Sequence, residues 1–297
     1  MTQNKKKHHY IPRFYLHGFA EITDPALLYV YQKGQRECFQ TTPERIGYEN
    51  NYYTIENDDG SRDTNTVEDY LHDQVESPAH AVLTKIRNQH IITTDDKWIF
   101  CRYVAYLMKR VPRARQRLKT IIAERVVESE KEAYDSEIDA AIAENPKRRE
   151  FYESRRREIH QVLGRYKEEV PSTILLNVLR YPSPRVTEAL SKMTWRFLVC
   201  PKGYFYLTSD NPVFYDEGTG ISKPYSEVTV PVSHQIALWL SWRTDLVEGY
   251  NMTTSQAVRQ INRRTVGNAT RYIFSPRHSE WIVTLANKRH HKLTRLI

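Results

Sequence analysis

The spacing of apolar residues divides the chain into strand-rich outer parts and a helical middle. Residues 26–31 and 37–40 predict a hairpin, because runs of aromatic and β-branched residues flank a turn at Lys33-Gly34. A further short strand is expected at 51–55. In the last third, strand-like alternation predicts strands at 195–199, 204–208, 228–232, 236–242 and 271–274, with a helix at 254–268 before the last of them.

The middle of the chain has helical periodicity. A helix is predicted to begin near Thr66, which forms a near-match to a capping box with Asp69, and Pro78 is expected to kink it. Thr93-Thr94-Asp95-Asp96 predicts the capped start of a second helix with a wide apolar face. A third helix is expected at 173–180.

Residues 123–170 are charged and poor in glycine, and Asn145-Pro146 interrupts them. This pattern predicts a projecting hairpin of two long antiparallel helices. We therefore expect an α+β fold, in which a helical block carrying the charged hairpin packs on a mainly antiparallel sheet. The chain is expected to form a single domain spanning residues 1–297.

Composition favours a globular protein that binds polyanions. Of the 297 residues, 40% are hydrophobic, and the net charge of +8 favours nucleic acid as a partner. No apolar run approaches the roughly 20 residues that cross a bilayer, and no signal peptide is recognisable, so we expect no membrane association. Three widely spaced cysteines fit no zinc site or disulfide framework, which indicates a reduced, cytoplasmic protein. Nucleotide-binding glycine motifs and a serine-nucleophile elbow are absent from the sequence.

The segment from His8 to Phe19 is unusually rich in aromatic and basic residues for a terminus. Pro12 favours an extended Ile11, and side chains alternate in extended chain, so His8 and His9 are expected to point in opposite directions. One imidazole could then face a cleft. The alternative is a solvated basic tail followed by core aromatic residues.

Three other groups could carry chemistry. Glu68, His72, Glu76 and His80 recur every four residues, so the first three could face one cleft and hold a hard divalent cation; the alternative is a solvated polar helix face. Asp210 and Asn211 follow the predicted strand at 204–208 and could serve a site or, alternatively, a plain Asx-turn. Arg110 and Arg113, on either side of Pro112, could grip phosphate or simply favour a helix C-terminus.

The opening residues His8 to Leu16 resemble the first motif of the DUF4238 family, bacterial proteins of unassigned function. The helix with Glu68 and Glu76 and the segment Phe205 to Pro212 are similar to the same family. The resemblance spans roughly His8 to Phe274. It implies where a site lies, and it implies no activity.

Together these features suggest a metal-dependent phosphodiester hydrolase, a nuclease acting on DNA or RNA. In this hypothesis Glu68, Glu76 and Asp210 bind Mg²⁺ or Mn²⁺, and His8 or His9 is the general base. Arg13, Arg110 and Arg113 neutralise phosphate, and Asn211 orients the substrate. We expect the opening motif to pack beside the end of the strand at 204–208, so that His8 or His9 lies near Asp210 and the helix that carries Glu68 and Glu76.

The alternative function is a non-enzymatic module that binds nucleic acid or protein. Residues 123–170 would be its contact arm, and could also mediate a homo-oligomer.

Overall fold

The computed structural model describes residues 7–57, 59–165, 176, 179, 183–289 and 293–296. The chain divides into two compact units, one made of residues 1–112 and 179–297 and the other of residues 113–178. Helices and mostly antiparallel strands make it an α+β fold, as predicted.

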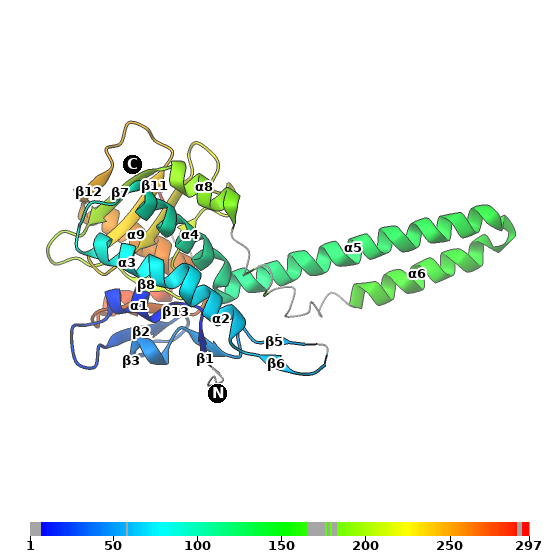
Figure 1. The fold of residues 1–297 in the computed structure, drawn as a ribbon, viewed down its shortest axis with the longest axis horizontal. Coiled ribbons are helices and arrows are strands. Elements are labelled where there is room, and N and C mark those ends of the chain that lie inside the picture. Colours follow the sequence, from blue (N-terminus) through cyan, green and yellow to red (C-terminus); the bar gives the residue numbers. More distant parts are fainter. Residues whose placement is uncertain are drawn as a thin grey trace. The chain divides into compact units, whose positions relative to one another are not determined.

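The larger unit contains a five-stranded sheet and a four-stranded sheet (Figure 1). The strand order of the five-stranded sheet is β12 (Gly249–Met252), β7 (Thr194–Val199), β11 (Ile236–Ser241), β10 (Glu227–Pro231) and β9 (Phe214–Tyr215). Only the β12–β7 pair is parallel. The order of the four-stranded sheet is β3 (Cys38–Thr41), β2 (Leu28–Gln32), β13 (Tyr272–Ser275) and β8 (Thr208–Ser209).

The predicted hairpin at 26–31 and 37–40 is therefore confirmed, but the expectation of one sheet is wrong. The hairpin pairs with β13 from the end of the chain, and this pairing forms a second sheet. Two short ribbons complete the strands: β1 (Lys7–His9) pairs with β4 (Tyr48–Asn50), and β5 (Ile55–Glu56) pairs with β6 (Arg62–Asp63).

Two strand predictions fail for identifiable reasons. Residues 51–53 form a turn, in which Asn51 takes a positive φ of 57°, a conformation that asparagine tolerates. In the segment 204–208 only Thr208 belongs to a strand. The side chain of Asn262 replaces a strand partner there: its oxygen accepts the N–H of Leu207 at 2.9 Å, and its amide donates to the carbonyl of Phe205 at 2.9 Å.

Helices cover both faces of the five-stranded sheet. Helix α4 (Thr94–Arg110) packs on one face, where the ring centroids of Phe100 and Trp195 are 6.1 Å apart. Helix α9 (Ser255–Asn268) packs on the other face, where its Val258 and Ile261 contact Trp239. This arrangement explains why all of β11 is buried, since a strand covered on both faces has no solvent side. The larger unit also contains the shorter helices α1 (Arg13–Leu16), α8 (Pro184–Lys192) and α10 (Glu280–Ala286).

The helix predicted from Thr66 contains a π-helical turn in place of a sharp kink. Helix α2 (Thr66–Leu71) continues through η3 (His72–Glu76) into α3 (Ser77–Arg87). The N–H of Ser77 bonds the carbonyl of His72, five residues back. The wider turn lies directly before Pro78, whose ring would clash with the carbonyl four residues earlier in a regular α-helix. The predicted Thr66 cap is wrong, since Asp63 accepts the N–H groups of Asn65 and Thr66 instead.

The smaller unit contains the two predicted antiparallel helices, α5 (Pro112–Glu144) and α6 (Arg149–Arg165), which Figure 1 draws side by side. They join at Asn145 and the short helix η4 (Pro146–Arg148), where the break was predicted. Asp135 of α5 pairs with His160 of α6 at 2.9 Å, and Arg156 of α6 pairs with Asp139 of α5. Helix α5 begins earlier than the predicted position 123 because Pro112 suits a first helical turn.

Residues 166–170 of the hairpin lie outside the described residues. So does most of the helix predicted at 173–180, in which only Leu176 and Leu179 are described, both of them buried. Within the described ranges, none of the helices has the length and apolar character needed to span a bilayer.

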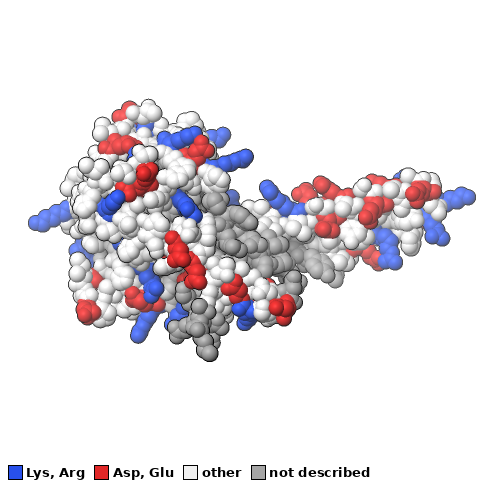
Figure 2. Space-filling view, in the orientation of Figure 1, with Lys and Arg blue, Asp and Glu red and all other residues white. Residues whose placement is uncertain are grey.

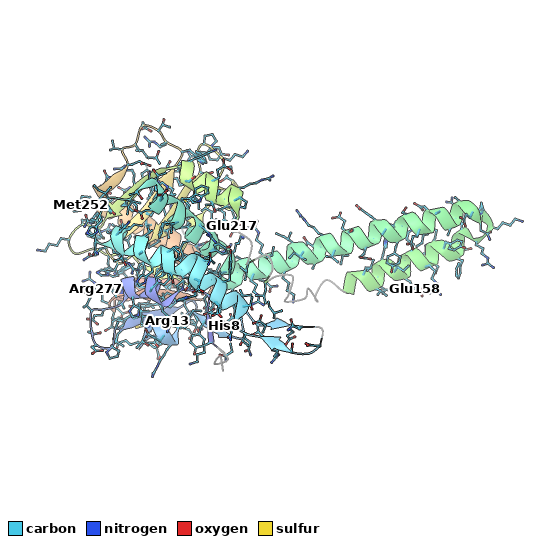
Figure 3. The ribbon with its side chains drawn as sticks, viewed as in Figure 1. His8, Arg13, Glu158, Glu217, Met252 and Arg277 are labelled. Carbon is cyan, nitrogen blue, oxygen red and sulfur yellow. The ribbon has the colours of Figure 1, made fainter. Side chains whose placement is uncertain are left out.

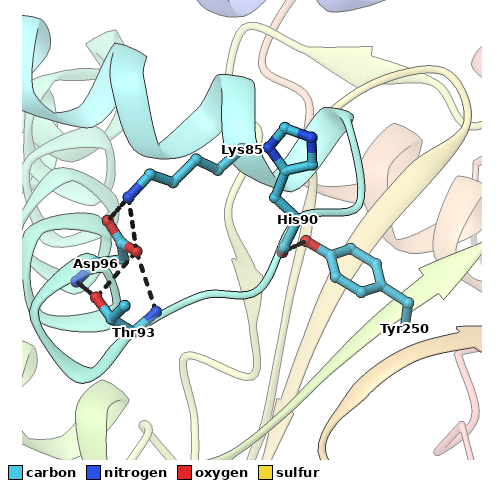
Figure 4. Close-up of polar contacts among 5 residues, drawn as sticks. All are labelled: Lys85, His90, Thr93, Asp96 and Tyr250. Carbon is cyan, nitrogen blue, oxygen red and sulfur yellow. Dashed lines mark hydrogen bonds and ion pairs between the residues drawn. The ribbon is translucent and has the colours of Figure 1, made fainter.

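The predicted cap at Thr93 is confirmed (Figure 4). Its hydroxyl accepts the N–H of Asp96 at 3.2 Å, and the Asp96 carboxylate accepts the N–H of Thr93 at 3.0 Å. Lys85 of α3 donates to both carboxylate oxygens, at 2.8 and 3.0 Å. Burial alone would raise the pKa of Asp96, but the bonds from Lys85 and Thr93 outweigh it and lower that pKa. The cap therefore fixes the α3–α4 junction.

We predict that Thr93→Ala lowers the free energy of unfolding by about 1 kcal/mol, the usual cost of losing such a cap. Thr66→Ala is the matched control, because Thr66 begins a helix without a capping bond from its hydroxyl. Urea unfolding of both variants checks the prediction, and equal losses would show that the Thr93 cap has no special role.

Candidate functional site

The buried guanidinium of Arg110 joins three separate parts of the larger unit. Arg110 ends α4 and is 1% exposed. It donates from Nη1 to Glu76 Oε1 at 2.6 Å, from Nε to the Tyr53 hydroxyl at 3.0 Å, and from Nη2 to the carbonyl oxygen of His9 at 2.5 Å. The opening motif, the η3 turn and the end of α4 therefore meet at one charged group.

This arrangement keeps Arg110 charged in the protein interior. Burial opposes the charge, but Tyr53 and Glu76 outweigh it and raise the pKa of Arg110. Because its donors are engaged inside the protein, Arg110 is a structural brace in this state. The prediction that it grips a substrate phosphate remains untested.

His8 and His9 point to different surroundings, as the alternation predicted. His8 is fully buried, and its Nδ1 accepts the N–H of Tyr53 at 2.7 Å. Its ring stacks on Tyr53 with centroids 5.5 Å apart. Because Nδ1 is an acceptor, the ring proton of neutral His8 is on Nε2. His8 therefore serves the fold and offers no free lone pair to a substrate.

His9 has different surroundings. Its pKa is lowered to about 4, chiefly by burial and also by the charges of Arg13 and Arg110, while the charge of Glu76 opposes the shift. The Glu44 backbone lies close enough to the imidazole to favour its protonated form. Within the described part of the chain the Nε2 of His9 is buried and has no hydrogen-bond partner. We therefore expect neutral His9 to carry its proton on Nδ1, towards the Glu44 backbone, and to leave the Nε2 lone pair unused.

Burial raises the pKa of Tyr53, and the negative charges of Glu68 and Glu76 add to the rise, so both carboxylates lie near that phenol. The prediction that His72 shares their face is wrong. The π-helical turn adds a residue to the four-residue step, so His72 is exposed and pairs with Asp73 at 2.8 Å. His80 is also exposed, and its ring centroid lies 4.9 Å from that of Phe14.

Asp210 serves the backbone, although not as a local Asx-turn. Its Oδ1 accepts the N–H of Thr270 at 2.8 Å, and its Oδ2 accepts those of Arg271 and Tyr272 at 2.7 and 3.0 Å. Burial raises the pKa of Asp210, and these three bonds oppose the rise. The carboxylate thus holds the turn between α9 and β13.

Asn211 binds the C-terminal end of α9. Its amide donates to the carbonyl of Asn268 at 3.1 Å, and its own carbonyl accepts the Asn268 amide at 2.9 Å.

The two remaining predicted phosphate ligands are exposed. Arg13 is on α1, and Figure 3 labels it together with His8 on the neighbouring β1. Its charge lowers the pKa of His9, so it lies near that imidazole. Arg113 is in α5, in the smaller unit.

The opening motif packs beside the end of the 204–208 segment, as predicted. Tyr15 lies 2.8 Å from the hydroxyl of Thr208 and donates to the Pro231 carbonyl at 2.6 Å. Since a phenol has one proton, Thr208 is the donor to Tyr15.

Arg87 completes this docking. It donates to the carbonyls of Phe14, Tyr15 and Val232 at 3.0, 2.8 and 2.9 Å. A Cβ at Gly18 would lie 2.2 Å from its Nη2, so this position requires glycine.

Sequence reasoning missed Arg87 and Tyr103. Tyr103 is fully buried, and its hydroxyl has no hydrogen-bond partner among the residues that the structure describes. Tyr103 has the sequence surroundings of an ordinary core residue. Arg87 had one signal: it directly follows the apolar Ile86 at the end of a buried helix.

The predicted metal ligands do not form one donor set in this structure. No group of three or more His, Cys, Asp or Glu side chains in the described ranges is arranged to hold an ion. The Asp210 oxygens accept three N–H groups, and Glu76 Oε1 pairs with Arg110. A site for Mg²⁺ or Mn²⁺ formed by Glu68, Glu76 and Asp210 stays a prediction that this geometry does not favour.

We predict that Arg110→Met lowers the free energy of unfolding by about 3 kcal/mol, because it leaves a largely buried Glu76 carboxylate without its cation. Adding Glu76→Gln should recover part of the loss, since the two side chains act as a pair. Arg125→Met, at an exposed position of α5, is the control and should change stability by less than about 0.5 kcal/mol. A loss at Arg110 no larger than the control would contradict the bracing role.

Comparisons with known proteins agree with the motif resemblance. The model of the family described as Protein of unknown function (DUF4238) matches residues 7–279. A search of curated proteins finds no match, and a search of solved structures finds none either. Because the matched region covers nearly all of the 297 residues, the chain belongs to the DUF4238 family.

Proposed function

We propose that this protein is a phosphodiester hydrolase acting on nucleic acid, with His9 as its general base and Arg13 as its phosphate ligand. One observation carries the proposal: a buried imidazole whose Nε2 has no hydrogen-bond partner among the described residues lies within reach of the charge of an exposed guanidinium, Arg13. A neutral imidazole can take a proton from an attacking water, and an adjacent guanidinium can stabilise the charge that develops on phosphate.

The low pKa of His9 is compatible with a site that binds an anionic substrate. Burial is its main cause, and the charges of Arg13 and Arg110 add to it. A phosphate bound at Arg13 would offset these charges and raise the pKa of His9 towards neutrality. The imidazole would then become a stronger base in the presence of substrate than in its absence.

The chemical step is a hydrolysis that needs no redox partner. His9 Nε2 accepts a proton as the water oxygen bonds to phosphorus, and the bond to the leaving oxygen breaks. The leaving oxygen takes a proton from solvent. Arg110 acts indirectly, because it holds the carbonyl of His9 and so positions the ring.

The distribution of charge supports nucleic acid as the substrate through local groups of cations. The net charge is +8, yet Lys and Arg alternate with Asp and Glu over the face that Figure 2 shows. Attraction of a polyanion would therefore depend on small groups of cations rather than on one basic face. The three free cysteines are compatible with a reducing compartment, and a cytoplasmic location is part of this proposal.

We predict cleavage of labelled single- or double-stranded DNA or RNA by the purified protein. His9→Gln should lower the initial rate by about 10²-fold or more, the usual contribution of a general base. Arg13→Gln should also lower the rate, with a weaker salt dependence of binding. His17→Gln is the matched control, since His17 is in the same motif and its imidazole pairs with Glu44 on the surface.

Parallel reactions with Mg²⁺, Mn²⁺ and EDTA test the metal prediction, because loss of cleavage in EDTA would restore it. Cleavage that is unchanged by His9→Gln would refute the role of His9. Salt-sensitive binding without any product would favour the non-enzymatic module, with the charged helices α5 and α6 as its candidate contact arm.

A further inference from the structure

A second feature of the larger unit, separate from His9, is a pair of hollows that share one wall. The first hollow has a volume of about 600 Å³ and lies between α9, α10 and the segment 203–205. The second, of about 700 Å³, is lined by the same segment and by residues from 20–22, 199–202, 234–235 and 276–277. Gly203, Tyr204 and Phe205 line both. Each is within the size range of pockets that bind small molecules.

Aromatic side chains form the first hollow and stay accessible in it. Tyr204 is 40% exposed and Trp281 is 42% exposed, which is high for residues that line a cavity. Phe205 lies beneath them, with its ring centroid 5.7 Å from that of Trp281. Val258 and Leu285 add an apolar floor. A flat aromatic ligand could therefore stack on a preformed surface.

The polar rim of the first hollow is cationic. Arg259, Arg263 and Lys288 line it, and none of the lining residues is acidic. The Arg259 guanidinium lies 5.8 Å from the centre of the Tyr204 ring. Within the described residues these three cations form no ion pair with a carboxylate. Elsewhere in the larger unit several cations do pair, as Arg264 does with Glu227 one residue beyond Arg263.

The second hollow is also lined by cations next to aromatic residues. Arg277, which Figure 3 labels, lies over the Phe205 ring at 4.4 Å, and Lys202 also lines the hollow. Glu21 is its single acidic lining residue. Cations thus line both hollows that share Tyr204 and Phe205, and an anionic chain could continue from one hollow to the other.

We infer that the first hollow binds a nucleoside phosphate, either as a free nucleotide or as one unit of a single strand. The base stacks on Trp281 and Tyr204, and the phosphate binds Arg259 and Arg263. Guanidinium groups suit phosphate because they donate bidentate hydrogen bonds, and their charge has no competing carboxylate here. This inference does not depend on the proposed hydrolysis, because it requires binding alone.

Isothermal titration of the full-length protein with AMP tests the inference. AMP contains no phosphodiester, so hydrolysis at His9 cannot affect the result. We expect saturable binding that is about tenfold weaker for adenosine, which lacks the phosphate, and for ribose 5-phosphate, which lacks the base. Equal binding of AMP and ribose 5-phosphate would reveal a simple anion site and overturn the inference.

Variants locate the ligand. Arg259→Gln/Arg263→Gln should weaken AMP binding about tenfold or more, and Trp281→Ala about fivefold or more. Arg36→Gln/Arg45→Gln removes the same charge at exposed positions outside the hollow and should bind as the wild type does. If the double arginine variant does not fold, Lys288→Gln gives the same test, because Lys288 is an exposed residue that lines the first hollow. His9→Gln should leave AMP binding unchanged.

A six-nucleotide single strand distinguishes the two sources of the ligand. Tighter binding of the oligonucleotide than of AMP assigns the site to single-stranded nucleic acid, and equal binding assigns it to a free nucleotide. Failure of both probes to bind at millimolar concentration, or binding that none of the pocket variants weakens, would refute the inference.

Discussion

The buried charge of Arg110 is the constraint on which the opening motif depends. A guanidinium without water must find anionic or carbonyl partners, and a buried cation without them would cost several kcal/mol. Glu76, Tyr53 and the carbonyl of His9 supply these partners from three different elements. These bonds therefore fix the opening motif against the η3 turn. Arg87 repeats the principle with three carbonyl oxygens, two of them in the same motif.

Most elements could be predicted from local sequence, because their signals are local. The cap at Thr93, the hairpin at Lys33-Gly34 and the break at Asn145 depend on a few adjacent residues. The separation into two sheets could not be predicted, since it depends on β2 pairing with a strand more than 200 residues later. The absence of a strand at 204–207 could not be predicted either, because a side chain of α9 supplies the hydrogen bonds that a neighbouring strand would make.

The candidate site shows the same division. The sequence correctly brought the opening motif and Glu76 together, because aromatic residues near a terminus must be buried somewhere. It could not assign roles within that group. Asp210, Asn211 and Arg110 all carry functional chemistry in principle, but three-dimensional contacts engage each of them with the protein's own backbone or with a neighbouring acid. His8 and His9 are adjacent in sequence, and only the contacts of their ring nitrogens separate a structural imidazole from a candidate base.

The ring nitrogens of these two histidines provide the most direct measurement. Long-range ¹H–¹⁵N NMR of the ¹⁵N-histidine protein reports the tautomer and the titration of each imidazole, and His9→Gln identifies the His9 signals. We expect His9 as the Nδ1–H tautomer, with a pKa of about 4 that rises when phosphate or an oligonucleotide is added. We expect neutral His8 as the Nε2–H tautomer. A His9 ring that carries its proton on Nε2, or that titrates near 6.5 as a solvated imidazole does, would contradict its assignment as a buried base with an unused lone pair.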